Sequence, residues 1–413
     1  MKRREFLTSG ALAAGSVWLS GLTFAGMANG RKPRLVFIIL RGALDGLEAV
    51  PACGDPAYAG LRGELQIGRP GTDGGALALD GTFGLHPALA FMHQSYAARE
   101  LIVFHAVASP YRDRSHFDGQ NVLETGYAVP HAVETGWLNR ALAAIPAGKA
   151  PEKERGISLA ATAPLVMRGP AAVTSWSPSR LAPLDDDTLQ RISDLYSRDP
   201  VLGKKLAEAL AAEAIADQDT ASQDPTMGGG PRPLLAKRGQ PRARYAEVVQ
   251  AAARFLRQED GPQVAVFDTV GWDSHFNEGG AKGQIATRLA TLDAALSALA
   301  AGLGPVWNDT AVLLATEFGR TVAENGTRGT DHGTATAAYL LGGAVNGGRV
   351  VADWPGLSPR QLYQDRDLRP TLDLRSVMKG LLAEHLQVPE RALESSVFPD
   401  SRAARPLTGL LRA

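Results

Sequence analysis

The stretch "VFDTVGWDSHFNEGG", residues 266–280, decides the fold, because it reads as a buried strand that stops at a polar, glycine-punctuated loop. Apolar, β-compatible residues surround Asp268, and Asp273 and His275 then follow two positions apart. In open α/β sheets, binding sites form beyond the carboxyl ends of the strands. Taken alone, the stretch leaves two interpretations open: a metal site at a strand end, or an ordinary polar loop. Asp268 is expected to be a strand residue with a structural role.

Other apolar runs of similar length also lead into polar or glycine-rich residues. Together with "VAVFDTV" (264–270), they are "RLVFIIL" (34–40), "LIVFHAV" (101–107), "AVLLATEF" (311–318) and "AYLLGGAV" (338–345). Continuous apolar runs of this kind suit parallel strands that are covered on both faces. Helical segments lie between several of them, most clearly at 285–303, where leucines recur at steps of three and four. The sequence therefore predicts an α/β three-layer sandwich with a mainly parallel central sheet.

The strand signal fades between about residues 165 and 245. Residues 185–217 read as helices, and Asp185–Asp187 suit a helix start. Residues 218–237 read as a glycine- and proline-rich loop. We therefore predict one α/β domain over residues 33–400 with a helical insertion at about 165–245.

The first 28 residues read as a targeting segment, not as part of the fold. Paired arginines in "KRREFLT" precede a mildly apolar stretch, and Gly26 and Ala28 supply small residues at its end. This resembles a twin-arginine export signal that is cleaved after Ala28. An uncleaved signal anchor is the alternative, but the apolar run is short and rich in glycine and alanine. No later segment reads as a membrane span, so we expect a soluble periplasmic or secreted protein.

The composition excludes several kinds of partner and site. Among 413 residues, Lys+Arg and Asp+Glu are equal at 43 each, and no basic stripe predicts a nucleic-acid partner. Cys53 is the single cysteine, so no intrachain disulfide and no cysteine metal cluster can form. Any bound metal must therefore be held by His, Asp, Glu or similar donors.

Side chains of this type recur where the apolar runs end. They are Asp45 after the first run, Ser115 and His116 after the second, Asp273 and His275 after 264–270, Glu317 and Arg320 after the fourth, and Asp331 and His332 in the loop before the last. Each has an ordinary explanation as a turn former, helix cap, ion pair or surface turn. Their recurrence at one predicted sheet edge favours a metal site. Such ligands suit one or two ions of zinc, manganese, magnesium or calcium.

Five motifs occur in a fixed order behind the arginine pair: "LRGALDGL", "SHFDGQNVLETG", "GWDSH", "TEFGRT" and "GTDHG". Together they resemble the bacterial family catalogued as domain of unknown function 1501, placed in the alkaline phosphatase and sulfatase superfamily. The resemblance implies an alkaline phosphatase-like fold and hydrolysis or transfer of phosphate or sulfate esters. It implies metal ligation by Asp45, Asp273, His275, Glu317 and His332, with Asp331 as a ligand or as the partner of one. Ser115 lies near the position of the nucleophile, while Phe318 replaces a histidine of the usual pattern.

The function hypothesis is a secreted metal-dependent hydrolase of phosphate or sulfate esters, or of a related anionic substrate. The ester could belong to a small molecule, a glycan or a peptide. Ser115 or a metal-activated water would attack, with His116 and Arg320 assisting. One alternative is a non-catalytic secreted binding or assembly protein on a degenerate hydrolase fold, and another is a metal-dependent group transferase. The remaining histidines, His86, His93, His105, His131 and His385, are expected in core or surface roles.

Overall fold

The computed structural model describes residues 32–146, 155–178, 192, 195–196, 199–217 and 241–412. Residues 33–412 form one compact unit, and the second unit comprises residues 1–32 with 413. The predicted export signal, the acidic helix start at 185–187 and the loop at 218–237 lie outside the described residues.

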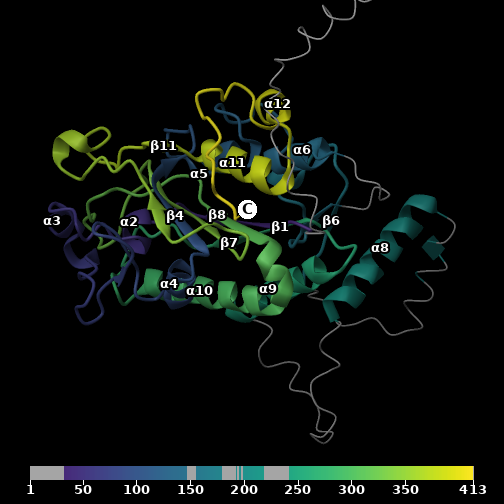
Figure 1. Ribbon diagram of the computed structural model, residues 1–413, viewed down its shortest axis with the longest axis horizontal. Coiled ribbons are helices and arrows are strands. Elements are labelled where there is room, and N and C mark those ends of the chain that lie inside the picture. Colours follow the sequence, from purple (N-terminus) through teal and green to yellow (C-terminus); the bar gives the residue numbers. More distant parts are fainter. Residues whose placement is uncertain are drawn as a thin grey trace, which may run out of the picture. The chain divides into compact units, whose positions relative to one another are not determined.

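Within the described residues, one nine-stranded sheet organises the compact unit (Figure 1). Its strand order is β10-β4-β9-β8-β1-β7-β5-β6, and β11 also pairs with β4. The strands are β1 (Arg34–Arg41), β4 (Leu101–Ala108), β5 (Gly156–Ser158), β6 (Val173–Ser175), β7 (Val264–Val270), β8 (Thr310–Ala315), β9 (Thr336–Leu341), β10 (Arg349–Val351) and β11 (Leu372–Asp373). The five apolar runs predicted as strands correspond to β1, β4, β7, β8 and β9. Strands β2 (Leu77–Ala78) and β3 (Gly84–Leu85) form a separate hairpin.

The direction of β9 determines which loops meet. It runs antiparallel to β4 and to β8, whereas the other pairs in the large sheet are parallel. The start of an antiparallel strand lies at the edge where its parallel neighbours end. The loop that carries Asp331 and His332 precedes β9, so it lies at the same edge as the carboxyl ends of β1, β4, β7 and β8.

Two apolar cores cover the two faces of the sheet, as β1 illustrates by alternation. Val36, Ile38 and Leu40 belong to one buried cluster, and Leu35, Phe37 and Ile39 belong to the other. The first face is covered by α4 (Ala90–Ala97), α9 (Pro241–Arg257) and α10 (Gln284–Leu303). The second is covered by α6 (Trp137–Ala144) and α11 (Leu374–Leu386) (Figure 1). The three-layer α/β architecture predicted from the apolar runs is therefore confirmed.

Five further helices lie among the described residues. They are α2 (Gly46–Ala49), α3 (Tyr58–Arg62), α5 (His116–Thr125), α8 (Pro200–Asp217) and α12 (Glu390–Ala392). Helix α8 lies in the stretch predicted to be helical. The three-residue strands β5 and β6 were not predicted because they are too short to produce an apolar run, and β6 lies within residues 165–245.

The prediction that no later segment is long and apolar enough to span a membrane was wrong. Residues 284–309, comprising α10 and the 3-10 turn that follows it, are long and apolar enough to span a membrane by length and composition. The apolar stripe of α10 is buried in the first core cluster; it comprises Ile285, Leu289, Leu292, Leu296 and Leu299. Part of the apolar surface of this helix thus packs in the core, against α9 and α4.

Candidate metal centre

Three loops bring potential metal ligands together at the carboxyl edge of the sheet. His116 is the first residue of α5, Asp273 follows β7, and His332 precedes β9. One ligand atom from each of these three side chains lies within 4.8 Å of the other two. The three come from chain segments more than 50 residues apart, so the fold itself assembles the group.

Asp273 lies at the centre of the group. Its Oδ1 is 3.0 Å from His275 Nε2 and 3.2 Å from His332 Nε2. Its Oδ2 is 3.4 Å from His116 Nε2. The side chains of these four residues are between 24% and 44% exposed, which leaves the group open to a solute.

Each imidazole presents Nε2 to the group and has an acceptor at its other nitrogen. His116 Nδ1 lies 2.9 Å from Glu317 Oε1, His332 Nδ1 lies 2.9 Å from the Arg114 carbonyl oxygen, and His275 Nδ1 lies 3.4 Å from Asp331 Oδ1. A carbonyl or carboxylate oxygen only accepts, so Nδ1 of each ring can donate to it, and Nε2 is the ring atom directed at the group. This is the arrangement that orients metal-binding histidines.

Two of the inward-facing nitrogens lie close enough to share a proton or a bound cation. His275 Nε2 and His332 Nε2 are 2.9 Å apart. Two lone pairs approach this closely only with a proton or a metal ion between them. His116 Nε2 is buried and has no hydrogen-bond partner. Imidazole nitrogens with one carboxylate are ligands that suit zinc, so these residues fit the divalent metal expected from the sequence.

Glu317, predicted as a ligand, lies behind His116. Its Oε1 accepts from Gly42 N at 2.9 Å, from His116 Nδ1 at 2.9 Å and from Gln120 Nε2 at 3.0 Å. Its Oε2 accepts from Thr316 Oγ1 at 2.8 Å. Burial opposes ionisation, but these hydrogen bonds hold the pKa of Glu317 below its ordinary value. The structure thus gives Glu317 the role of orienting His116.

Asp45 lies outside the group because its carboxylate is engaged elsewhere. It caps α2, accepting at Oδ1 from Leu47 N and Glu48 N at 2.9 and 3.1 Å. Its Oδ2 is 2.6 Å from Nη2 of the fully buried Arg62. The metal-ligand role implied for Asp45 therefore corresponds here to a helix cap in a buried ion pair.

Arg320 and Asp331 also support the group from behind. Arg320 Nη1 is 2.6 Å from Asp273 Oδ1, and its Nε donates to Thr330 Oγ1 at 3.0 Å. The Arg320 side chain is fully buried, so its predicted place beside a substrate becomes a place beside Asp273. Asp331 accepts from Asn325 Nδ2 at 3.2 Å as well as facing His275.

Ser115 is the N-cap residue of α5, directly before His116. Its side chain makes no capping hydrogen bond, and its N–H donates to the Tyr111 hydroxyl at 3.2 Å. A helix N-terminus favours negative charge, so an ionised hydroxyl would be stabilised at this position. The placement keeps Ser115 next to the ligand group, as the nucleophile hypothesis requires.

The charges of the group are coupled. The hydrogen bond to Glu317 raises the pKa of His116 above its ordinary value. Burial, followed by the neighbouring positive charges of His116 and Arg320, lowers the pKa of His332. Burial acts to raise the pKa of Asp273, but Arg320 prevails and holds it below the usual value. Asp273 is thus an anion at neutral pH, and His332 is a neutral base.

Two glycines allow the loops to approach each other. Gly42 has φ +116°, and a Cβ there would lie 2.6 Å from the Asp273 backbone nitrogen. A Cβ at Gly329 would lie 2.4 Å from the His275 carbonyl carbon. Both distances are too short for a side-chain atom, so the loop positions depend on glycine at these sites.

The other histidines lie apart from the group. Buried His86, His105 and His385 have ring nitrogens near the carbonyl oxygens of Gly280, Val50 and Arg34 respectively. His93 contacts the Ala78 carbonyl oxygen, and His131 contacts Asp118. These are core and surface roles.

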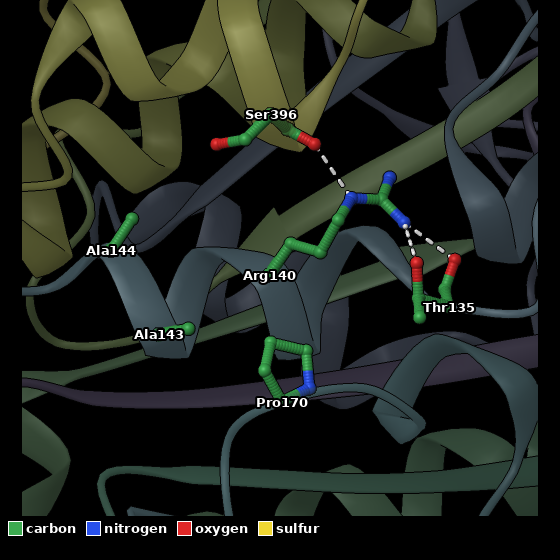
Figure 2. Close-up of a pocket in the computed structure, with 6 residues that line it drawn as sticks. All are labelled: Thr135, Arg140, Ala143, Ala144, Pro170 and Ser396. Carbon is green, nitrogen blue, oxygen red and sulfur yellow. Dashed lines mark hydrogen bonds between the residues drawn. The ribbon is translucent and has the colours of Figure 1, made fainter.

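A pocket of about 260 Å³ lies at the other end of α5 (Figure 2). Arg140 lines it and donates to the carbonyl oxygens of Ser396, Thr135, Thr125 and Val397, as well as to the Thr135 hydroxyl. All five guanidinium N–H groups are thereby used within the protein. No N–H group of Arg140 is therefore free to bind a ligand in this pocket. Arg140 instead links the end of α5 to the turn at 393–397.

Several residues that support the group were not predicted from the sequence. Gln120 holds Glu317, and Asp367 and Arg366 hold the loop of His332. Gln120 lies one turn after His116 on α5, a spacing that could have indicated it. The segment around Asp367 carries no recognisable pattern.

Residues 32–397 match the family described as "Protein of unknown function (DUF1501)". The chain belongs to this family. The match covers the whole sheet and every residue of the candidate metal centre, so the centre lies within the part of the chain that defines the DUF1501 family. None of the curated proteins compared with the chain matches it.

Several solved structures resemble this DUF1501 protein at low sequence identity. A phosphonate monoester hydrolase of Agrobacterium radiobacter has 10% identity and a TM-score of 0.41, covering 86% of this chain and 74% of its own. Ps i-CgsB, solved with k-i-k-neocarrahexaose, has 9% identity and a TM-score of 0.40, covering 91% and 77%. The C-terminal periplasmic domain of EcEptC from Escherichia coli, solved with zinc, has 10% identity and a TM-score of 0.29, covering 76% and 73%.

Proposed function

We propose that this DUF1501 protein is a metal-dependent hydrolase that acts on a phosphate or sulfate ester or a related anionic ester. The observation that carries the proposal is the convergence of three histidine Nε2 atoms on Asp273, each ring backed by an acceptor at Nδ1. A structural ion-pair network would not need three imidazoles oriented in this way. The convergence supports a bound divalent cation, with zinc the best fit to the donors.

The residues of the centre divide into those that would bind the metal and those that would orient these metal-binding side chains. His116, Asp273, His275 and His332 would hold it, while Glu317, Asp331 and Arg320 would keep the ligands in place. When bound, the metal would supply Lewis-acid polarisation of an ester oxygen. The anionic group of the substrate is the natural ligand for the open side of such a centre.

Ser115 supplies a nucleophile candidate beside this centre. Its hydroxyl makes no capping hydrogen bond to α5, and Ser115 directly precedes His116 in the chain. The N-terminus of α5 would stabilise the hydroxyl as it loses its proton. His332, a neutral base whose pKa is lowered, presents Nε2 in the same group and could receive that proton only in a state where it does not hold the metal.

The experiment is a panel of phosphate and sulfate monoesters assayed with zinc-loaded protein. We expect turnover of at least one class of ester, its loss on chelation, and its loss in His332→Ala. The Ser115→Ala variant separates attack by Ser115 from attack by water, because only the first predicts a large loss with zinc still bound. Full zinc occupancy with no turnover on the panel would contradict the hydrolase proposal and leave the binding-protein alternative.

We also propose that the protein is exported in folded form and processed near Ala28. The arginine pair at Arg3–Arg4 and the short apolar stretch after it support this proposal. The mass of the mature protein in the native host is the test. An intact N-terminus in exported protein would contradict the processing, and unchanged export after both arginines are replaced by lysine would contradict the export route.

A further inference from the structure

Asp367 is a buried carboxylate that holds two arginines and a threonine near the candidate metal centre. It is 0% exposed. Its Oδ2 accepts from Arg114 Nε at 2.9 Å and from Thr334 Oγ1 at 3.0 Å, and its Oδ1 accepts from Arg366 Nε at 2.8 Å. Both carboxylate oxygens therefore have charged or polar donors from three separate chain positions.

Two of these donors lead directly to His332, on opposite sides of it. The Arg114 carbonyl oxygen accepts from His332 Nδ1 at 2.9 Å. The Arg366 Nη2 atom donates to the His332 carbonyl oxygen. Thr334, the third donor to Asp367, lies two residues after His332 in the same loop. Asp367 thus fixes both the ring and the backbone of this metal-ligand candidate.

The backbone at Arg114 makes the support by Asp367 necessary. Arg114 has φ +62°, a left-handed conformation that is uncommon for a residue other than glycine. Its carbonyl oxygen, held in this conformation, is the acceptor that keeps the hydrogen on His332 Nδ1. Such conformations persist where the surrounding structure holds them, and they are frequent at functional sites. The Arg114 side chain is held by the ion pair with Asp367, in which Nη2 and Oδ2 are 2.7 Å apart, and by a hydrogen bond from Nη2 to Gln364 Oε1 at 2.6 Å.

We propose that Asp367 is a positioning residue for the metal centre: through Arg114 and Arg366 it fixes the orientation and the tautomer of His332, so that Nε2 remains the metal-binding atom. The proposal rests on the metal site of the proposed function. It distinguishes Asp367 from an ordinary buried ion pair, because an ordinary pair would stabilise the fold without affecting metal affinity or the His332 tautomer.

The test compares Asp367→Asn with wild type and with Asp373→Asn as a matched control. Asn keeps the shape of the side chain but cannot accept from all three donors. Asp373 caps α11 and pairs with Arg375, so its substitution affects a helix cap and an ion pair that do not include His332. The readouts are zinc affinity by chelator competition, the imidazole ¹⁵N shifts of His332, and the melting temperature of the metal-free protein.

We expect Asp367→Asn to weaken zinc binding by about 10- to 100-fold, the usual effect of removing support from a metal ligand. We also expect His332 to lose its single Nδ1–H tautomer. Asp373→Asn should lower the melting temperature without changing either signal. Unchanged zinc affinity and an unchanged tautomer in Asp367→Asn would overturn the proposal while leaving the metal site intact.

If Asp367→Asn does not fold, Arg366→Ala provides the second test. The Arg366 side chain is 45% exposed, so its removal should be tolerated by the fold. It removes the donor to the His332 carbonyl oxygen, and weakened zinc binding is again expected. Full zinc affinity in Arg366→Ala would contradict the positioning of His332 by Asp367 through Arg366. A wild-type protein that binds no zinc would overturn both this inference and the proposed function, whereas a zinc-binding wild type with unaffected variants would overturn the inference alone.

Discussion

Glu317 affects how readily a metal ion can replace a proton on the His116 ring. The carboxylate accepts from His116 Nδ1 and raises the pKa of that imidazole. A metal that binds Nε2 must displace the proton that Nε2 carries in the imidazolium, so metal affinity should fall as the pH drops through the raised pKa of His116. The same hydrogen bond orients the ring for metal binding. Glu317 therefore strengthens the competition from the proton and also improves the geometry of metal binding.

Replacing Glu317 by Gln separates the two effects. In the metal-free protein we expect the pKa of His116 to fall relative to wild type, because the neutral amide no longer stabilises the imidazolium. At pH 8, where the proton competes little, zinc affinity should fall by about 10-fold because the ring is less well oriented. Titration of the His116 ring protons by NMR measures the first effect and chelator competition the second.

The control for this variant is Glu384→Gln, which changes a carboxylate on α11 that accepts from Gly409 N. It should leave both measurements unchanged. A His116 pKa that is the same in Glu317→Gln as in wild type would show that the hydrogen bond does not control the titration.

At the scale of elements, the meeting of the loop after β1 with the loop after β7 depends on one backbone position. Gly42 has φ +116°, and any Cβ there would overlap the Asp273 nitrogen. We expect Gly42→Ala to destabilise the protein by on the order of 1–3 kcal/mol, since it combines an unfavourable backbone conformation with a steric overlap. Because the overlap displaces Asp273, zinc affinity should fall as well.

Gly60→Ala is the matched control for Gly42→Ala. Gly60 lies in α3, and a Cβ there would contact nothing within 4 Å. Alanine is the better helix former, so this variant should be as stable as wild type or more stable. Urea unfolding of both variants measures the difference, and equal stability of Gly42→Ala and Gly60→Ala would contradict the close approach of the two loops.

Five strands of the central sheet, β1, β4, β7, β8 and β9, were predictable because each is a continuous apolar run, as "RLVFIIL" in β1 shows. The convergence of Asp273 with His332 could be anticipated only as a shared edge. It depends on β9 running antiparallel, which no local pattern reports. Strand direction is set by tertiary packing, so the sequence predicted which residues lie near the edge but not which of them contact one another.

The roles of individual site residues were less predictable. Glu317 and Asp45 are both acidic residues at strand ends, yet one supports His116 and the other caps α2. The difference arises from Arg62, whose guanidinium takes the second oxygen of Asp45 and which is distant from any motif in the sequence. Residue type and spacing specify possible ligands, while the neighbours that occupy their lone pairs come from the fold.

At the scale of the whole molecule, a buried acidic cluster beneath the site links stability to pH. Asp45, Glu48 and Glu278 surround Arg62, and Glu48 and Glu278 are 0% exposed. Burial raises the pKa of Glu278 to about 7 and raises the pKa of Glu48 well above its ordinary value. The single guanidinium of Arg62 neutralises the charge of only one carboxylate, so the other acids of the cluster favour their protonated form.

This cluster predicts a loss of stability as the pH rises. The folded protein binds a proton at Glu278 that the unfolded chain releases near pH 4.3, so its contribution is fully present below about 4.3 and is lost as the pH rises to about 7. Glu278→Gln cannot ionise, and its amide oxygen can still accept from Thr330. We expect this variant to be more stable than wild type at pH 8 and to show a smaller decline between pH 5 and 8.

Urea unfolding at several pH values provides the measurement, with Glu247→Gln as the control. Glu247 is exposed on α9, so its substitution should leave the pH profile of wild type unchanged. A profile for Glu278→Gln that parallels wild type would show that Glu278 is ionised throughout this range in the folded protein.

The most direct test of the whole account is the metal content of the purified protein. Elemental analysis by mass spectrometry should find about one zinc or other divalent ion per chain in wild type. His131→Ala, which changes an exposed histidine paired with Asp118, should retain that metal. Asp273→Ala and His332→Ala should each lose it. Metal-free wild type, or full metal content in both of these variants, would contradict the assignment of the centre.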